Sequence, residues 1–164
     1  MIPFRIGYGY DSHRFDETGE LVLGGVKFPG ERRLKGHSDA DVLIHAVIDA
    51  LLGAAGLGDI GGHFPDTDER WRGADSAKLL EAVAGELEAS GFRTVNIDAT
   101  VVCERPRLAR RIADIRARLS SLLGISAGQV SVKGKTNEKM DDVGAGAGIV
   151  AHAVCLLEKI APGA

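Results

Sequence analysis

Hydrophobic and polar positions follow two different periods along this chain, and the periods predict strands and helices in turn. Alternation of apolar and polar residues, or a run of β-branched residues, is typical of a strand. Such segments cover residues 3–12, 21–28, 94–104, 130–135 and 149–160, the second with a glycine bulge or turn inside it. Apolar residues that return every three or four positions predict helices, and these segments cover residues 38–56, 75–90 and 106–122.

The ends of these helices are predicted from residues that start or stop a helix. Ser38 is expected to be the N-cap of the first helix, with Asp41 three residues later as in a capping box. Gly56 can close the same helix, and Pro106 suits the first turn of the third. The segment 57–73 is rich in glycine, proline and aspartate, so we expect a loop there.

The resulting order of elements is strand, strand, helix, helix, strand, helix, strand. This order predicts an α+β sandwich of the ferredoxin-like kind, with a four-stranded main sheet and the helices on one face. The chain has 164 residues, of which 45% are hydrophobic, and this composition fits one domain spanning residues 1–164.

Charge and apolar runs exclude several classes of partner. The net charge is only −3, and charges of both signs are interspersed, so no basic field for nucleic acid is expected. The arginine-rich segment 104–118 has no interleaved aromatic residues to stack bases, which favours a solvated basic face over an RNA site. We find no signal peptide and no apolar run near the ~20 residues of a membrane span. A cytoplasmic protein with no nucleic-acid or membrane partner is expected.

The two cysteines give no indication of a thiolate metal site. Cys103 and Cys155 both lie in apolar runs, where buried reduced thiols are typical. No CxxC pair exists, so a thiolate zinc site is excluded.

A carboxylate and two imidazoles predict a metal site. Asp11 and His13 share one face of the first strand because side chains alternate along a strand, although this pair alone could equally lie on the surface. His45 interrupts the apolar stripe of the first helix and completes a set of three ligands. The set suits zinc or a similar divalent transition metal, and three protein ligands leave one tetrahedral position free.

Two further residues near this set have open interpretations. Asp41 lies one helical turn before His45, where it can accept a hydrogen bond from an imidazole N–H or simply favour the start of the helix. His63 is interpreted as a loop residue rather than a fourth ligand.

Three polar loops are candidates for binding a ligand. Backbone N–H groups and the carboxylates of segment 57–73 could hold hydroxyl groups, although its aspartates could also be solvated turn residues. The segment KGKTNEK, residues 133–139, could clamp a diphosphate and bind a second cation through Glu138, or could be a charged turn. Backbone groups of the loop 103–109 could meet a base or a phosphate.

Four stretches together carry a resemblance to a known family. They are YDSH near the start, GHSDADVLIHAVIDALLGAAGLGDIG and FPDTD in the middle, and TNEK near the end. With them the chain resembles, nearly end to end, the 2-C-methyl-D-erythritol 2,4-cyclodiphosphate synthase family. The resemblance implies a homotrimer of α+β subunits with active sites between neighbours.

The resemblance also implies a role for each matching residue. Asp11, His13 and His45 match the zinc ligands, and His37 and Thr136 match residues that steady the transition state. Asp11 and His13 also match substrate-binding positions. The positions that hold the methylerythritol phosphate portion correspond to His37, Ser38, Asp59, Ile60, Gly61, Phe64, Pro65, Asp66, Thr67 and Asp68. The positions that hold the cytidine diphosphate correspond to Cys103, Glu104, Arg105, Pro106, Arg107, Leu108, Ala109, Lys135, Thr136, Asn137 and Glu138. Glu138 also matches the ligand of a magnesium or manganese ion.

The implied reaction is an intramolecular phosphoryl transfer in the non-mevalonate route to isoprenoids. The 2-phosphate of 4-diphosphocytidyl-2-C-methyl-D-erythritol 2-phosphate attacks the β-phosphorus, which closes a cyclic diphosphate and expels CMP, as in a phosphorus–oxygen lyase. Charge repulsion and alignment form the main barrier, so cations and a held loop suffice without a protein nucleophile.

The chain departs from the family pattern near its C-terminus. Asp142 stands where an aromatic or aliphatic residue is common, and Ala145 stands where an arginine is common. Without that arginine, neither a cationic contact to the substrate phosphate nor an isoprenoid-diphosphate pocket on the trimer axis is expected. The ammonium group of Lys135 could replace the missing positive charge. Two other functions stay open: a zinc-dependent phosphohydrolase, and a non-catalytic trimer that binds cytidine or isoprenoid diphosphates.

Overall fold

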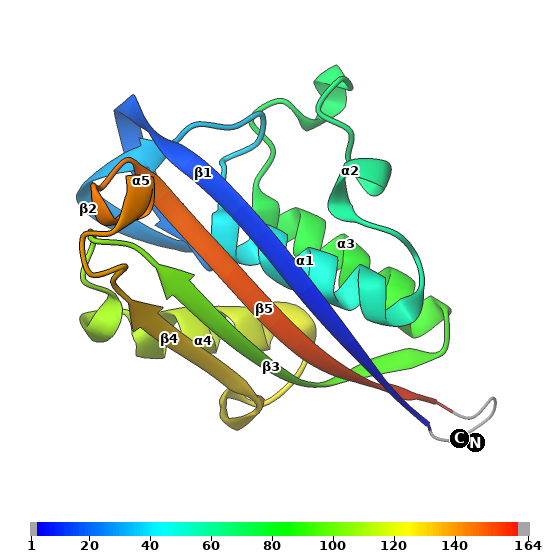
Figure 1. Ribbon diagram of the computed structural model, residues 1–164. Helices are drawn as coiled ribbons and strands as arrows, with labels where there is room; N and C mark the ends of the chain where they lie inside the picture. The colour runs from blue at the N-terminus through cyan, green and yellow to red at the C-terminus, as the bar shows by residue number, and fades with distance from the viewer. Residues whose placement is uncertain (1–2, 161–164) are drawn as a thin grey trace.

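The computed structural model describes residues 3–160 of the chain, and its elements alternate between strands and helices (Figure 1). The strands are β1 (Phe4–Leu23), β2 (Val26–Leu34), β3 (Phe92–Val102), β4 (Val130–Lys135) and β5 (Gly148–Lys159). The α-helices are α1 (Val42–Ala55), α2 (Ile60–His63), α3 (Ser76–Ala89), α4 (Ile112–Leu123) and α5 (Asp141–Gly144). Three short 3-10 turns are η1 (Glu69–Trp71), η2 (Leu108–Arg110) and η3 (Ala127–Gln129).

The strands form one five-stranded mixed sheet in the order β2-β1-β5-β3-β4. The pairs β1/β2, β1/β5 and β3/β5 are antiparallel, whereas β3/β4 is parallel. The predicted α+β class is confirmed, but the predicted four-stranded sheet is wrong by one strand, since β2 pairs with the outer half of β1. The order also differs from the ferredoxin-like one, because β3 and β4 are direct neighbours instead of the separated strands of a split β-α-β unit.

Strand β1 is much longer than the predicted strand 3–12. Its first part pairs with β5, and its last part pairs with β2. The predicted strand 21–28 is therefore two strands joined by a turn at Gly24 and Gly25, whose φ angles are 60° and 71°. Positive φ at both central residues is the geometry that a two-residue hairpin turn requires, so two glycines fit there.

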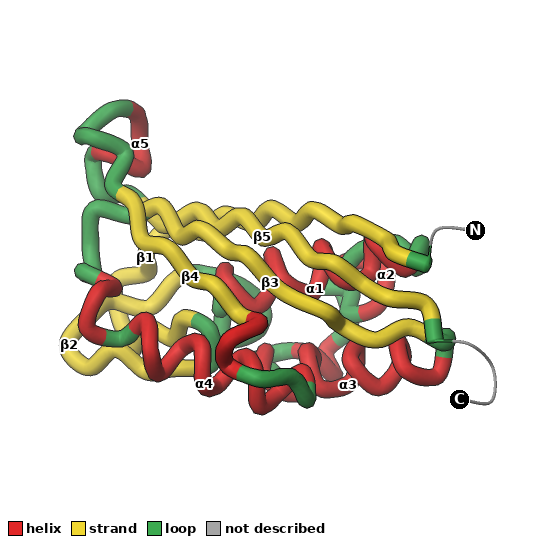
Figure 2. The backbone as a smooth tube through the Cα atoms, turned by 90° about the horizontal axis from the view of Figure 1, so that it is seen from below, coloured by secondary structure: helices red, strands yellow, loops and turns green. Residues whose placement is uncertain are grey.

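Helices α1, α3 and α4 lie together on one side of the sheet (Figure 2). Helix α1 packs directly on β1, because a Cβ added at Gly7 or Gly9 would lie 1.8 Å from a carbonyl oxygen of α1. Glycine at these two positions lets the helix approach the strand. The alternation of the strand then turns Asp11 and His13 toward the same helix.

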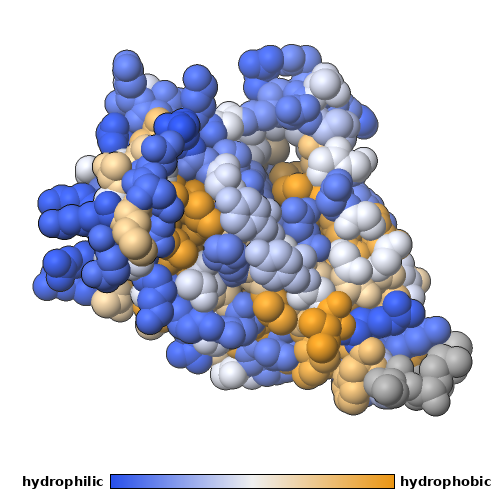
Figure 3. Space-filling model, in the orientation of Figure 1, coloured by the Kyte–Doolittle hydropathy of each residue, from blue (hydrophilic) through white to orange (hydrophobic). Residues whose placement is uncertain are grey.

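The opposite face of the sheet carries large exposed hydrophobic side chains. Ile6 is 76% exposed, Tyr8 61%, Tyr10 50% and Val154 43%. Apolar side chains gather over the end of β1 and β5 that lies near the termini (Figure 3). The hydrophobic core therefore lies between the sheet and its single helical layer, and the other face has no layer of its own within residues 3–160.

The first helix begins three residues later than predicted. Asp41, not Ser38, is the N-cap of α1, and its carboxylate accepts a hydrogen bond from the backbone N–H of Ile44 at 3.1 Å. The same carboxylate accepts the N–H groups of Gly24 at 2.9 Å and Gly25 at 2.6 Å, so the hairpin turn holds it in place. The predicted closure by Gly56 is confirmed, with φ of 76°.

Two other boundaries differ from the sequence-based expectation. The expected loop 57–73 contains α2 and η1, each started by an aspartate side chain. Helix α4 begins at Ile112 after the 3-10 turn η2, so Pro106 is not in its first turn. Within the described residues, no helix has both the length and the apolar character needed to cross a membrane.

Candidate metal centre and the loops around it

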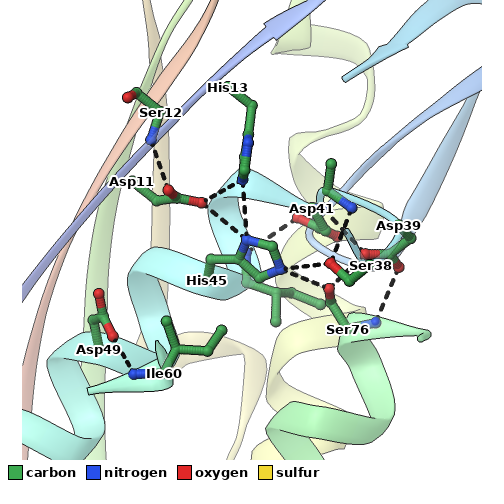
Figure 4. Close-up of polar contacts among 12 residues, drawn as sticks. Asp11, Ser12, His13, Ser38, Asp39, Asp41, His45, Asp49, Ile60 and Ser76 are labelled. Atoms are coloured by element: carbon green, nitrogen blue, oxygen red, sulfur yellow. Dashed lines mark hydrogen bonds and ion pairs between the residues drawn. The ribbon is translucent and has the colours of Figure 1, made fainter. Parts of the chain in front are cut away.

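Asp11, His13 and His45 converge at the junction of β1 and α1 (Figure 4). Asp11 Oδ2 lies 2.9 Å from His45 Nδ1 and 3.0 Å from His13 Nε2. The two ring nitrogens lie 3.3 Å from each other. Residues 32 positions or more apart in the chain are thus brought together because α1 packs on β1.

Three electron-rich atoms at such distances need a hydrogen or a metal ion between them. A carboxylate oxygen only accepts, and an unprotonated imidazole nitrogen presents a lone pair. A proton on a ring or a metal ion satisfies all three atoms together. One oxygen and two imidazole nitrogens form a donor set that suits a divalent transition metal, so the residues present fit such an ion.

The pKa values of His45 and Asp11 show that each of these side chains stabilises the charged form of the other. Burial lowers the pKa of His45, but the hydrogen bond and negative charge of Asp11, with the charges of Asp41 and Asp39, outweigh it and raise the pKa above its usual value. Burial raises the pKa of Asp11, but His13 and His45 outweigh it and hold that pKa well below its usual range. The carboxylate is therefore ionised next to a site that attracts cations.

Asp41 does not contact an imidazole. It is fully buried, and its oxygens accept backbone N–H groups of the hairpin turn and of α1. Of the two interpretations of Asp41, hydrogen bonding to a histidine is therefore wrong, and the start of the helix is its role. Burial raises the pKa of its carboxyl group. His45 Nε2 instead faces the hydroxyl oxygens of Ser76 at 2.9 Å and Ser38 at 3.2 Å.

His37 lies beside the loop that contains FPDTD. Its Nε2 is 3.3 Å from the carbonyl oxygen of Asp68, and its own carbonyl oxygen accepts the N–H of Gly73 at 2.8 Å. Asp68 caps η1 and pairs with Arg70, which lowers the pKa of that carboxyl group. The predicted residues His37, Ser38 and 64–68 thus lie on the same side of the molecule as the trio.

Helix α2 is tied to the helix that carries His45. Asp49, one turn beyond His45 in α1, accepts the backbone N–H of Ile60 at 2.8 Å, and Asp59 accepts that of Gly62 at 2.9 Å. His63 lies 3.3 Å from Glu86 through Nδ1, and its described contacts include none of the trio. It is the last residue of α2, so its interpretation as a loop residue is wrong.

Most of the remaining predicted residues line another cavity. Its volume is about 430 Å³, and Lys135 and Thr136 line it with Cys103, Glu104 and residues 106–109. Asn137 donates its backbone N–H to Glu104 at 3.1 Å, and the Thr136 hydroxyl donates to Glu138 at 2.8 Å. None of the trio lines this cavity. Within one chain, the predicted site residues therefore fall into two separate groups.

The unusual Asp142 has a partner of its own. Its carboxylate accepts a hydrogen bond from the Arg14 guanidinium group at 2.9 Å, and both side chains are exposed. Arg14 directly follows the metal-ligand candidate His13 in β1. The ion pair thus joins the short helix α5 to the middle of β1, the strand that carries Asp11 and His13.

Three residues near the trio were missed by sequence reasoning. Asp49 lies four residues after His45, and this helical spacing was a signal that could have found it. Asp39 lies between Ser38 and Asp41, but only the structure shows that its carboxylate accepts hydrogen bonds from Ser76. Ser76 is 31 residues from His45, and no local pattern indicates their contact.

Comparison with known proteins identifies the family of this chain. A model of the YgbB family matches residues 4–158. The chain belongs to the YgbB family. A curated 2-C-methyl-D-erythritol 2,4-cyclodiphosphate synthase of Rubrobacter xylanophilus is 55% identical, over 97% of this chain and 98% of the relative. A bifunctional enzyme IspD/IspF of an Anaeromyxobacter species is 54% identical over 96% of this chain, which spans 41% of that longer protein.

A solved structure shares the fold of this YgbB-family chain. IspF of Plasmodium falciparum, described as a CDP complex, superposes with a TM-score of 0.85 at 34% identity. The match covers 98% of this chain and 99% of that one. Relatives named as synthases over nearly their whole length show that the chain belongs to a family of enzymes.

Proposed function

We propose that this chain converts 4-diphosphocytidyl-2-C-methyl-D-erythritol 2-phosphate into 2-C-methyl-D-erythritol 2,4-cyclodiphosphate and releases CMP. It would act as a phosphorus–oxygen lyase of the non-mevalonate isoprenoid route, in the cytoplasm, with residues 1–164 as one domain. The observation that carries the proposal is the convergence of Asp11, His13 and His45 in a chain with synthase relatives.

The trio is proposed to hold zinc, and Glu138 a magnesium or manganese ion shared with the substrate diphosphate. Glu138 is exposed and accepts only the Thr136 hydroxyl among its described hydrogen bonds, so its second oxygen is free to bind a hard cation. Bound divalent cations would neutralise phosphate charge and polarise the phosphorus that is attacked.

The residues of the chain would supply binding and alignment. His37, Ser38, Asp59 to Gly61 and the segment 64–68 are proposed to hold the methylerythritol phosphate portion. Residues 103–109 and 135–138 are proposed to hold the cytidine diphosphate. Both phosphorus groups belong to one substrate molecule, so the attack is intramolecular. Holding the two groups aligned against their charge repulsion would lower the barrier without a protein nucleophile.

A protein nucleophile is not needed, and the cysteines are unsuited to that role. Both thiols are buried, and burial raises the pKa of Cys103 and of Cys155 to about 11. A thiol with such a pKa is almost entirely protonated near neutral pH, and the thiolate is the nucleophilic form.

A homotrimer with active sites between subunits is proposed on two grounds. The exposed apolar face of the sheet is a surface that a second copy could cover. The two groups of predicted residues lie apart within one chain, so a site built from both groups would be completed by a neighbour.

The test is incubation of the purified protein with the diphosphocytidyl substrate, with and without a chelator, followed by phosphorus NMR. We expect a cyclic diphosphate and CMP, and loss of both when the chelator is present. Linear phosphate products would instead indicate a phosphohydrolase. Binding of the substrate without any release of CMP would indicate a non-catalytic trimer.

A further inference from the structure

His45 has polar partners on both edges of its ring, and only one edge belongs to the metal site. The residue is 8% exposed. Nδ1 faces Asp11, whereas Nε2 lies 2.9 Å from Ser76 Oγ on the opposite edge (Figure 4). Ser76 is the first residue of α3 and is completely buried.

The direction of the Ser76 hydroxyl is set by Asp39. Ser76 Oγ lies 2.5 Å from Asp39 Oδ1, and the Ser76 backbone N–H donates to Asp39 Oδ2 at 3.0 Å. An ionised carboxylate can only accept, so the hydroxyl hydrogen of Ser76 points to Asp39. Both oxygens of Asp39 are thus used to hold one serine.

The same hydroxyl therefore offers only a lone pair to His45. A hydrogen bond across 2.9 Å then requires His45 Nε2 to carry the hydrogen. The tautomer with hydrogen on Nε2 leaves a lone pair on Nδ1, which is the atom 2.9 Å from Asp11 Oδ2. A ring that must donate on one edge is thereby ready to bind a cation on the other.

We propose that Asp39 and Ser76 are positioning residues that hold His45 in the tautomer and orientation needed for a metal ion at Nδ1. The inference rests on the proposed metal site. It names two residues that orient the candidate ligand His45 without being ligands themselves. A carboxylate that orients a histidine ligand usually contacts the ring directly. Here a serine from another helix stands between carboxylate and ring, so the start of α3 takes part in the metal centre.

Ser38 is the competing partner of Nε2. Its Oγ lies 3.2 Å from Nε2 and accepts the N–H of Ala40 at 3.2 Å, so no carboxylate fixes its hydroxyl hydrogen. A freely oriented hydroxyl can donate or accept, and it does not select a tautomer. We therefore assign the selection of the His45 tautomer to the Asp39–Ser76 pair.

The first experiment measures zinc affinity of the full chain by competition with a metal-binding dye. Ser76→Ala is expected to weaken Zn²⁺ binding about 10- to 100-fold, the usual effect of losing a group that orients a ligand. Asp39→Ala is expected to weaken Zn²⁺ binding to a similar extent. The double variant is expected to bind Zn²⁺ as well as the weaker-binding single variant does, because the two residues act as a unit. Ser38→Ala is expected to have the smaller effect.

Two further variants distinguish the orientation of His45 from a general effect of losing a buried hydroxyl group. Ser120 is another buried serine, and its hydroxyl donates to the Ala117 carbonyl within α4, so Ser120→Ala removes the same group without touching His45. We expect Ser120→Ala to bind Zn²⁺ like the original protein. Ser76→Thr keeps the hydroxyl and is expected to recover affinity relative to Ser76→Ala.

Nitrogen NMR of histidine-labelled protein gives a second readout, which reports directly where the hydrogen of the His45 ring lies. In the zinc-loaded original protein, His45 should show hydrogen on Nε2 with slow exchange against water, and Ser76→Ala should speed that exchange. Hydrogen on Nδ1, or Ser76→Ala with original zinc affinity and exchange, would overturn the proposed role. An original protein that binds no Zn²⁺ at the trio would overturn the metal site itself, which is a separate outcome.

Discussion

At the residue scale, Asp11 and His45 influence each other's charge state. Asp11 stays ionised because two imidazoles face it, and His45 has a raised pKa because that carboxylate outweighs its burial. Neither residue has this chemistry on its own in an unfolded chain. The close approach creates a site where a divalent ion replaces a proton.

His45→Ala removes one of three candidate ligands and should abolish zinc binding and CMP release while the fold persists. We expect metal content to fall from about one ion per chain to near none, measured by elemental analysis after purification. His63→Ala is the control, because it removes an imidazole that lies beside Glu86 and outside the trio. Normal metal content and full activity in His45→Ala would contradict the assignment.

The two thiols predict slow alkylation that depends on pH. Because burial raises the pKa of Cys103 and Cys155 to about 11, the thiolate fraction is small in neutral solution and grows only as the pH rises toward that value. Iodoacetamide labelling followed by mass spectrometry should therefore be slow in native protein and fast in denaturant. Rapid native labelling at neutral pH would show that a thiol is exposed or ionised.

At the element scale, α1 organises most of the site. It packs on the glycines of β1, carries His45, and holds the start of α2 through Asp49. Burial raises the pKa of the Asp49 carboxyl group, but the backbone N–H of Ile60 lowers it in part. A short helix such as α2 is marginal alone, so a tether to a long packed helix decides its position.

Asp49→Ala should loosen the α2 segment without removing a metal ligand. Loss of one hydrogen bond to the Ile60 N–H should cost about 1 kcal/mol of folding free energy. We expect faster hydrogen exchange in residues 57–64 and a raised KM, with zinc affinity retained. Asp49→Asn keeps an acceptor oxygen and should have a smaller effect on exchange. Equal exchange rates in the original protein and both variants would show that the Asp49–Ile60 hydrogen bond does not hold α2 in place.

At the scale of the whole molecule, one face of the sheet is covered by helices and the other is bare within residues 3–160. Large exposed hydrophobic side chains on strands are typical of a surface that meets another protein. The separation of the two groups of predicted site residues points in the same direction. The proposed trimer accounts for both observations.

Ile6→Lys tests the apolar face. Ile6 is 76% exposed in the single chain, so the substitution should change the stability of an isolated subunit little. If copies meet on this face, the added charges repel and the trimer should dissociate, as seen by sedimentation. Ala82→Lys, at an exposed position of α3, is the control and should leave assembly unchanged. A trimer that survives Ile6→Lys would place the interface elsewhere.

Local patterns in the chain were enough to predict the class of fold and to single out the three residues that converge, Asp11, His13 and His45. Alternation placed Asp11 and His13 on one face of a strand, and helical spacing placed His45 on a helix, because both periods are set by backbone geometry. The same reasoning mistook Ser38 for the cap of α1. A cap depends on which side chain reaches the free N–H groups, and the hairpin turn holds Asp41 there.

Tertiary structure alone decided the strand order, the fifth strand and the partners of His45. These depend on contacts between residues far apart in the chain, and such contacts leave no periodic signal. Ser76 meets His45 only because α3 packs beside α1, and Asp39 meets Ser76 for the same reason. Residue types indicate which chemistry is available, whereas packing determines which atoms face one another and therefore where each hydrogen lies.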